Sequence, residues 1–190
     1  MTPNLTGDTI LKVEHLSMRF GGLMAINDFS FEAKRGEITA LIGPNGAGKT
    51  TCFNLLSTFL KPTAGSIHFN GRNIENSDPA TVADSGLVRS FQISAVFGQM
   101  TVLENVRVAL QRKTRWNYAF WRNQSVLHVL DARARELLDM VGLGKWADLP
   151  AAELPYGRKR VLELATTIAL EPELILLDEP MAGLGHEDIG

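Results

Sequence analysis

The residues of this chain with the clearest chemical capacity form a glycine-rich segment that ends in a lysine and two threonines. The segment fits the phosphate-binding pattern G-x-x-x-x-G-K-[ST] without a mismatch and consists of Gly43, Pro44, Asn45, Gly46, Ala47, Gly48, Lys49, Thr50 and Thr51. Glycines let the backbone curl until successive N–H groups point at one spot, where a helix N-terminus adds partial positive charge. Lys49 can reach the β- and γ-phosphates of a nucleotide, and the Thr50 hydroxyl can bind Mg²⁺.

The sequence around this loop has the order of strand, loop and helix that a phosphate site requires. The apolar segment 37–42 predicts a strand. The segment from Thr51 predicts a helix that ends near Leu60, because Pro62 follows Lys61. The alternative is a glycine-rich turn that matches the pattern by chance, and the correct flanks disfavour it.

Two adjacent acids form a second candidate site. They follow Leu174–Leu177, an apolar run that predicts a strand buried on both faces of a parallel sheet. Open α/β sheets place ligands at this end of their strands, so Asp178 could be a second Mg²⁺ ligand and Glu179 could orient an attacking water. The alternative is that both acids only mark a strand end that reaches solvent. The presence of a phosphate loop in the same chain makes this alternative less favoured.

Composition places the chain among ordinary globular proteins. It has 190 residues, 45% hydrophobic and 21% charged, with a formal net charge of −2, which disfavours a general nucleic-acid binder. The single Cys52 excludes an internal disulfide and fits a reducing compartment. No window of about 18 apolar uncharged residues occurs, and the N-terminus lacks the order of a signal peptide, so we expect a cytoplasmic protein or one held at a membrane by partners.

Hydrophobic periodicity predicts short antiparallel strands in the first part of the chain and helices in the second. Such strands are expected over 11–20, 25–33 and 65–74, with turns at Gly21-Gly22 and Asn70-Gly71, and the segment 88–92 is also strand-like. Helices are expected to start at the Asp78 cap and at the Thr101–Glu104 capping box, and to cover 126–141 and 160–170.

Taken in order, these motifs resemble the nucleotide-binding subunit of an ABC transporter. Walker A corresponds to 43–51, the Q-loop glutamine to Gln92, the signature to 154–158 and Walker B to 174–178. The same resemblance places the catalytic glutamate at Glu179, the D-loop at 182–185 and the aromatic residue that stacks on adenine at Phe20. The motifs together cover nearly the whole chain.

The resemblance implies an α/β fold: a P-loop NTPase core with an antiparallel β subdomain and a helical subdomain, incomplete at the C-terminus. Residues 1–91 would form the β subdomain and the first part of the core, 92–164 the helical subdomain, and 165–190 the return to the core. The family continues to a switch histidine that contacts the γ-phosphate. His186 follows Glu179 too closely for that role and is expected to be an ordinary exposed histidine.

The resemblance also implies an ATPase with ATP and Mg²⁺ as cofactors. Its catalytic residues would be Glu179 and Gln92, and its metal ligands Thr50, Gln92 and Asp178. Phe20, the loop 43–51, Tyr156 and Gly157 would bind nucleotide, the last two in the site of a partner subunit. Pro155 stands where many relatives have serine, Arg158 replaces the usual glutamine, and Gly185 replaces a polar D-loop residue.

A closer resemblance is to the LivG-type ATPases of branched-chain amino-acid importers. It is carried by 20–25, 89–92, 100–106, the tyrosine-containing signature and 182–184. It implies a second ATPase subunit, two membrane permeases and a periplasmic or surface substrate-binding protein as partners, no nucleic acid, and a place at the cytoplasmic face of the inner membrane. A urea or amide importer of the same branch is the close alternative.

Other functions remain open at this point. The family continues beyond the length of this chain. We therefore expect the chain to be either a fragment of a longer protein or a truncated, non-hydrolysing nucleotide-binding module. A soluble ABC ATPase of translation or repair is less favoured, because neither a second cassette nor a coiled-coil insertion is present. The basic and aromatic stretch 107–122 is interpreted first as an amphipathic insertion, then as a contact for a membrane-facing partner, and least as a nucleic-acid patch.

Overall fold

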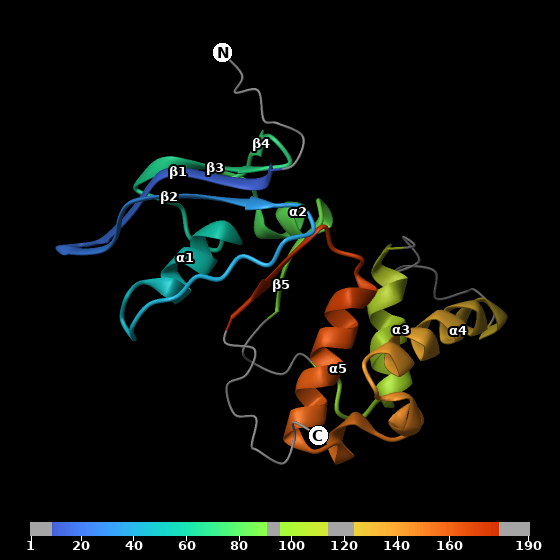
Figure 1. Cartoon of the computed structure of the whole chain (residues 1–190). Coiled ribbons are helices and arrows are strands. Elements are labelled where there is room, and N and C mark those ends of the chain that lie inside the picture. Colours follow the sequence, from blue (N-terminus) through green and yellow to red (C-terminus); the bar gives the residue numbers. More distant parts are fainter. Residues whose placement is uncertain (1–8, 91–95, 114–123, 179–190) are drawn as a thin grey trace. The chain divides into compact units, whose positions relative to one another are not determined.

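The computed structural model describes residues 9–90, 96–113 and 124–178 (Figure 1). Contacts divide the chain into two units, Met1–Val88 and Arg89–Gly190, and each is described by itself. The expected division at 91 and 164 into three segments remains a prediction.

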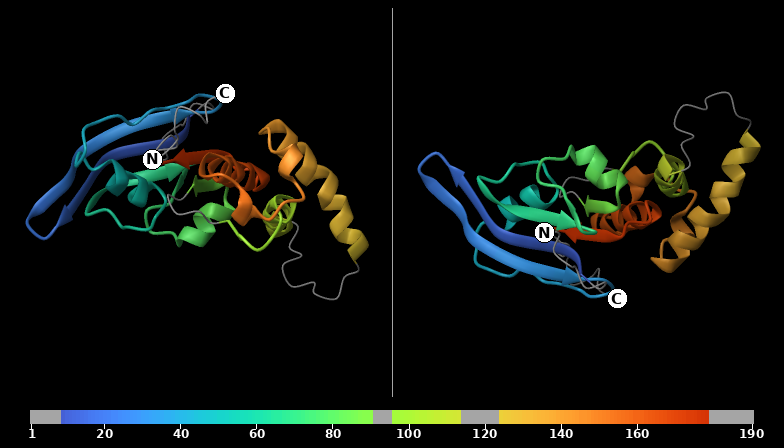
Figure 2. Two further views of the ribbon diagram at one scale, coloured as in Figure 1. Left: turned by 90° about the horizontal axis from the view of Figure 1, so that it is seen from below. Right: turned by 90° about the horizontal axis from the view of Figure 1, so that it is seen from above.

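The first unit is built on an antiparallel sheet. Its strands are β1 (Thr9–Phe20), β2 (Leu23–Lys34), β3 (Ala64–Phe69) and β4 (Arg72–Asn73), in the order β2-β1-β3-β4. β1 and β2 form a long two-stranded ribbon, visible in Figures 1 and 2. The turn between β3 and β4 has positive φ at Asn70 (49°) and Gly71 (72°), as a tight hairpin requires. The antiparallel strands expected from alternation are therefore confirmed.

A bulge in β1 keeps its apolar side chains on the buried face. Strict alternation from Val13 would turn Leu16 toward solvent, yet both side chains are almost completely buried. His15 adopts φ 51° and the register with β2 shifts between Val13 and Leu16, so one extra residue is inserted. The bulge thereby extends the core of this unit, which also contains Ile10, Leu11, Cys52, Leu55, Leu56, Ile67 and Phe69.

Two short helices complete the first unit. Helix α1 (Lys49–Leu56) ends four residues before the expected Leu60, because Thr58 turns left-handed (φ 58°) and the Leu60 N–H bonds back to the Asn54 carbonyl at 3.1 Å. Helix α2 (Pro79–Asp84) begins as expected: an oxygen of the Asp78 carboxylate accepts from the Ala80 N–H at 3.0 Å.

The strand expected over 37–42 is wrong as a description of the first unit. This segment has no regular secondary structure, and Ile38 and Ile42 are 100% and 88% exposed. A strand forms only where its N–H and C=O groups pair with a neighbour, and no described strand of the first unit pairs with this segment. The apolar composition of 37–42 was therefore not sufficient to predict a strand.

The second unit consists mainly of helices. Its elements are α3 (Val102–Lys113), α4 (Gln124–Met140), two short 3-10 turns, η2 (Gly144–Trp146) and η3 (Ala151–Glu153), α5 (Tyr156–Ala169) and β6 (Leu174–Leu177). β5 (Leu87–Ser90), which starts at the unit boundary, pairs with β6. β6 was expected to be buried on both faces, but Leu177 is exposed and only Leu176 is fully buried. A sheet of two strands leaves such a strand partly uncovered.

Helices α3, α4 and α5 lie beside one another (Figure 2) and enclose an apolar core. The core members share helical spacing and are Val102, Leu103, Val106, Leu110, Ala134, Leu137, Leu138, Leu162, Ala165 and Ala169. Helix α5 begins at Tyr156, four residues earlier than the expected Arg160, with Pro155 as its N-cap residue. The expected helix over 126–141 is confirmed by α4, and its last turn is closed at Gly142 (φ 74°).

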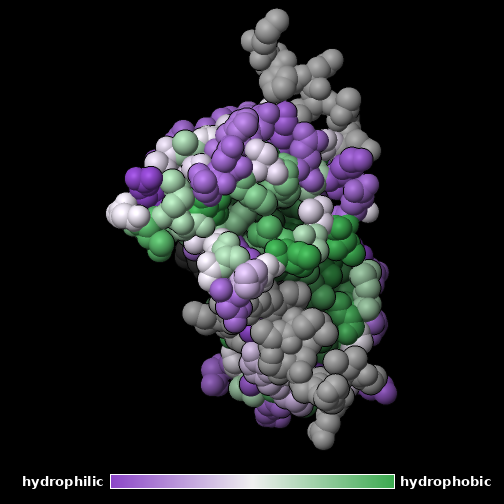
Figure 3. Space-filling view, turned by 60° about the vertical axis from the view of Figure 1, so that its left-hand side comes forward, coloured by the Kyte–Doolittle hydropathy of each residue, from purple (hydrophilic) through white to green (hydrophobic). Residues whose placement is uncertain are grey.

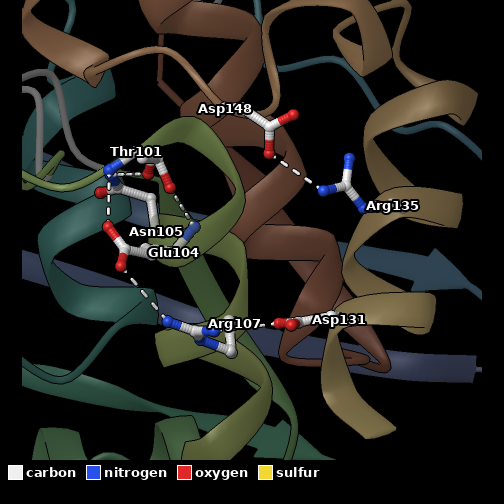
Figure 4. Close-up of polar contacts among 7 residues, drawn as sticks. All are labelled: Thr101, Glu104, Asn105, Arg107, Asp131, Arg135 and Asp148. Carbon is white, nitrogen blue, oxygen red and sulfur yellow. Dashed lines mark hydrogen bonds and ion pairs between the residues drawn. The ribbon is translucent and has the colours of Figure 1, made fainter. Parts of the chain in front are cut away.

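A polar network fixes the start of α3, as Figure 4 shows. The expected capping box is present: the Thr101 hydroxyl accepts from the Glu104 N–H at 3.1 Å, and the Glu104 carboxylate accepts from the Thr101 N–H at 2.8 Å. Asn105 is buried and accepts from the Phe97 N–H at 2.8 Å, while its amide N–H groups donate to the carbonyls of Phe97 and Thr101. The loop before α3 is therefore held by side chains of the helix that follows it.

Two ion pairs connect α4 to its neighbours (Figure 4). Arg107 of α3 donates to the Asp131 carboxylate of α4 at 3.1 Å, and Arg135 of α4 donates to Asp148 at 2.9 Å. Arg107, the first residue of the basic stretch 107–122, is thus neutralised inside the helical unit. The aromatic residues of that stretch, Trp116, Tyr118, Phe120 and Trp121, lie outside the described residues.

The described surface carries both polar and apolar side chains. Hydrophilic residues cover much of the face drawn in Figure 3, with hydrophobic side chains exposed beside them. In the first unit the large apolar side chains that are exposed are Phe20, Leu23, Met24, Ile38, Ile42 and Phe59. Within the described ranges, no helix has the length and apolar character needed to cross a membrane.

Asn105→Asp should destabilise the protein by about 2–3 kcal/mol, because it places a carboxylate against two carbonyl oxygens that now accept hydrogen bonds. Urea unfolding measures the change. The matched control is Asn27→Asp at an exposed position of β2, for which we expect a change within about 0.5 kcal/mol. Equal effects of the two substitutions would contradict a structural role of the Asn105 network.

Candidate functional site

The glycine-rich segment forms an open loop that leads directly into α1. Gly46 and Gly48 both have φ 83°, a left-handed conformation that side chains disfavour. Gly48 is the N-cap of α1, and its carbonyl accepts from the Cys52 N–H at 2.8 Å. No side chain caps this helix end, so N–H groups of the first turn remain available to an anion.

The second of these glycines lies against the backbone of β2. A Cβ atom at Gly48 would be 2.6 Å from the Ala25 carbonyl oxygen, well inside contact distance. At Gly46, which has the same φ, a Cβ atom would meet nothing within 4 Å. Gly48 is therefore required for close packing as well as for backbone conformation, and it anchors the loop to the antiparallel sheet.

The lysine of the loop lies across the loop itself. The Lys49 ammonium donates to the carbonyl oxygens of Gly43 at 2.8 Å and Pro44 at 3.0 Å. Within the loop the Ala47 N–H also donates to the Pro44 carbonyl at 3.2 Å. These bonds hold the positive charge over the concave side of the loop, where phosphate oxygens would be stronger acceptors than carbonyls.

The residues after Lys49 divide between the surface and the core. Thr50 is exposed and can offer its hydroxyl to a ligand, whereas Thr51 is half-buried. Cys52 is buried in the core, and burial raises the pKa of its thiol to about 11. The thiol is therefore neutral at physiological pH and serves packing, not chemistry.

Phe20, expected to stack on adenine, is at the end of β1 and pairs with Leu23 across the turn. Phe20 is 45% exposed, so part of its surface is open to a ligand. Phe20 belongs to the same unit as the phosphate loop, on the ribbon that includes Ala25.

In the second unit, Asp178 forms a buried ion pair. A guanidinium nitrogen of Arg89 lies 2.8 Å from Oδ2 of Asp178, and the two side chains are 10% and 6% exposed. Strands β5 and β6 set this geometry, since Arg89 belongs to β5 and Asp178 follows β6 directly. Burial of both charges is tolerated because they pair.

The signature segment forms the first turn of α5. Tyr156 is exposed, and its hydroxyl oxygen accepts from Arg160 Nε at 3.2 Å and Nη2 at 3.0 Å, while Gly157 is buried. Arg160 also bonds Glu163 at 2.9 Å, and hydrogen bonds with Glu163 and Tyr156 raise the pKa of its guanidinium. Arg158 lies over the ring of Trp146, 3.6 Å from its centroid.

Several expected site residues are outside the described part of the chain. These are Gln92, Glu179, the D-loop segment 182–185 and His186. Of the rest, the loop residues and Phe20 belong to the first unit, and Asp178, Tyr156 and Gly157 belong to the second. The roles assigned to all of these residues remain predictions.

Comparison with known proteins decides the family. The family described as "ABC transporter" matches residues 26–182. The chain is 43% identical over 187 residues to the high-affinity branched-chain amino acid transport ATP-binding protein LivG of Salmonella typhimurium, covering 94% of this chain and 72% of LivG. The chain belongs to the ABC transporter family.

Solved structures of ABC cassettes share the fold. A cassette of an ABC transporter in its ADP conformation has a TM-score of 0.78 and 30% identity, covering 95% of this chain and 74% of that chain. The CbiO1 protein of Clostridium perfringens, part of the ABC transporter complex CbiONQ, has a TM-score of 0.76 and 28% identity, covering 95% and 69%. The expected fold, a P-loop ABC ATPase with an antiparallel sheet, is confirmed.

Sequence reasoning about this ABC ATPase missed three contacts made by the expected site residues. Arg89 was only part of a matching segment, yet it pairs with Asp178. Ala25 supplies the carbonyl against which Gly48 packs. Trp146 supports Arg158 at the signature. The lone arginine in a short strand was a usable signal for the Arg89–Asp178 pair. The contacts made by Ala25 and Trp146 are not encoded by residue spacing.

Gly48→Ala should cost more stability than Gly46→Ala. Both substitutions force an alanine into a left-handed conformation at about 1–2 kcal/mol, but only the Cβ at Gly48 meets a backbone oxygen. We expect Gly48→Ala to lower the urea midpoint further and to abolish nucleotide binding, measured with a fluorescent ATP analogue. Equal losses for both variants would show that the contact with Ala25 has no role.

Proposed function

We propose that this chain is the ATP-binding subunit of an ABC importer that takes up branched-chain amino acids or similar small substrates. The observation that carries the proposal is 43% identity to LivG over 94% of the chain. The open loop crossed by Lys49 supports nucleotide binding. A urea or amide importer of the same branch is the alternative, because substrate choice belongs to the permeases and the binding protein.

Nucleotide binding begins at the loop 43–51. The Lys49 ammonium exchanges its two carbonyl partners for phosphate oxygens, which carry full charge and form stronger hydrogen bonds. The N-terminus of α1 contributes N–H donors and its dipole. Phe20 offers a half-exposed ring for the base. The packing of Gly48 on Ala25 holds the loop in place while these partners exchange.

The oxygen donors of the chain fit Mg²⁺ bound together with a nucleotide. Among the described residues, no group of three or more His, Cys, Asp or Glu could hold a metal alone. Mg²⁺ needs only one or two protein ligands in such sites, because phosphates and waters supply the others. Thr50, Gln92 and Asp178 offer hard oxygens to it. Mg²⁺ bound there would neutralise charge on the phosphates.

Hydrolysis requires residues from two subunits. Glu179 orients the attacking water at the near side of the nucleotide. Tyr156 and Gly157 approach the nucleotide held by a partner ATPase subunit, and Arg160 fixes the Tyr156 hydroxyl for that contact. The helix start behind them lacks acidic residues, so its dipole is available to an anion.

We also propose the assembly that this role requires. ABC ATP-binding subunits work with membrane permeases, so this chain would bind two permease subunits and pair with a second ATPase subunit. A periplasmic or surface substrate-binding protein would deliver the substrate. The chain would lie at the cytoplasmic face of the inner membrane, held there through the permeases.

Lys49→Ala should weaken ATP binding about 100-fold, since charge-assisted hydrogen bonds contribute roughly 1.5–3 kcal/mol each. Fluorescence anisotropy of a labelled ATP analogue measures the dissociation constant. Lys61→Ala is the matched control, because Lys61 is an exposed lysine that lies beyond α1, and we expect no change there. Equal affinity of the wild type and the Lys49 variant would reject the loop as the nucleotide site.

Glu179→Gln should leave ATP binding unchanged and lower steady-state turnover by about 100-fold or more, the range for loss of a general base. Phosphate release is measured with the partner ATPase and permeases present, and Glu153→Gln, an exposed acid in η3, is the control. Unchanged turnover would remove Glu179 as the catalytic residue. A wild type that binds ATP without turnover would instead support the binding-only module.

Leucine uptake compared with urea uptake by the same complex decides the substrate class.

A further inference from the structure

We propose that Arg89 is a positioning residue that orients the Asp178 carboxylate for Mg²⁺-dependent nucleotide binding. This role rests on the proposed function, in which Asp178 is a metal ligand. Arg89 touches neither nucleotide nor metal in this scheme and acts only through the carboxylate that it holds.

The contact between the two side chains is fixed by the backbone. Arg89 lies in β5, and the neighbouring Ser90 hydroxyl donates to the Leu176 carbonyl of β6 at 3.4 Å. Asp178 comes directly after β6, so the pairing of the two strands brings the guanidinium to the carboxylate. The 2.8 Å separation and the almost complete burial of both side chains leave little rotational freedom.

Arg89 engages only one of the two oxygens of the Asp178 carboxylate, which suits a carboxylate that also binds a metal. Arg89 donates to Oδ2, which leaves Oδ1 as the oxygen for a single-contact ligand bond. Carboxylates that bind metals are commonly held by a second hydrogen-bond partner, and loss of that partner weakens metal affinity about 10–100-fold. A planar guanidinium is suited to this task because its donors have fixed directions.

The charge of Arg89 could instead repel a divalent cation and thereby weaken its binding. This effect is smaller at the present site, because Mg²⁺ arrives with nucleotide phosphates whose negative charge exceeds its own. Orientation of the carboxylate is then the dominant contribution. If repulsion dominated, removal of Arg89 would strengthen Mg²⁺ binding, whereas loss of orientation weakens it. One Mg²⁺ titration therefore separates the two effects.

The test measures binding of a fluorescent ATP analogue to the full chain, first in EDTA and then across a Mg²⁺ titration. For Arg89→Met we expect affinity in EDTA within about twofold of the wild type and a Mg²⁺ midpoint raised about 10–100-fold. Arg89→Lys should give a smaller rise in the midpoint. An unchanged or lowered midpoint in both variants would overturn the proposal.

A double-mutant comparison distinguishes positioning from a purely structural role. In an Asp178→Asn background, adding Arg89→Met or Arg89→Lys should not shift the Mg²⁺ midpoint further, because the carboxylate is already absent. A further shift in that background would contradict action through Asp178. If Arg89→Met does not fold by circular dichroism, the Lys variant in the two backgrounds gives the same comparison. A wild type that binds no nucleotide would reject the proposed function itself, an outcome separate from an unchanged midpoint.

Discussion

The phosphate loop depends on one close contact between backbones. Gly48 lies so near the Ala25 carbonyl that no side chain fits between them. This contact attaches the first turn of α1 to β2, and α1 in turn contributes Cys52, Leu55 and Leu56 to the core beneath the sheet. Loop shape, helix position and sheet packing are therefore coupled in the first unit, and a change at this point affects all three.

Much of the architecture follows from local signals in the sequence. The Asn70-Gly71 turn, the Asp78 cap and the Thr101–Glu104 capping box are all present. Each depends on neighbours within a few residues, so spacing alone encodes it. The bonds of Lys49 within the phosphate loop belong to the same class, whereas the contact of Gly48 with Ala25 does not.

Features that depend on distant partners could not be predicted in this way. The segment 37–42 has the composition of a strand, yet strand formation requires a paired neighbour. The early end of α1 is a local feature that was also missed, because it depends on a left-handed turn at Thr58 that β-branched threonine rarely adopts. The pairing of Arg89 with Asp178 joins residues far apart in the chain. For 37–42 and for the Arg89–Asp178 pair, the outcome depended on pairing with a distant segment or on its absence.

The stacking of Arg158 on Trp146 has a consequence for how the signature varies among relatives. The guanidinium covers one face of the indole, so neither side chain can be exchanged without exposing the other. Arginine at 158 and an aromatic residue at 146 should therefore be inherited together in this branch. Relatives that keep glutamine at the signature position are free of that constraint and should accept smaller residues at 146. The segment 154–158 thus depends on a residue that is not adjacent to it in sequence.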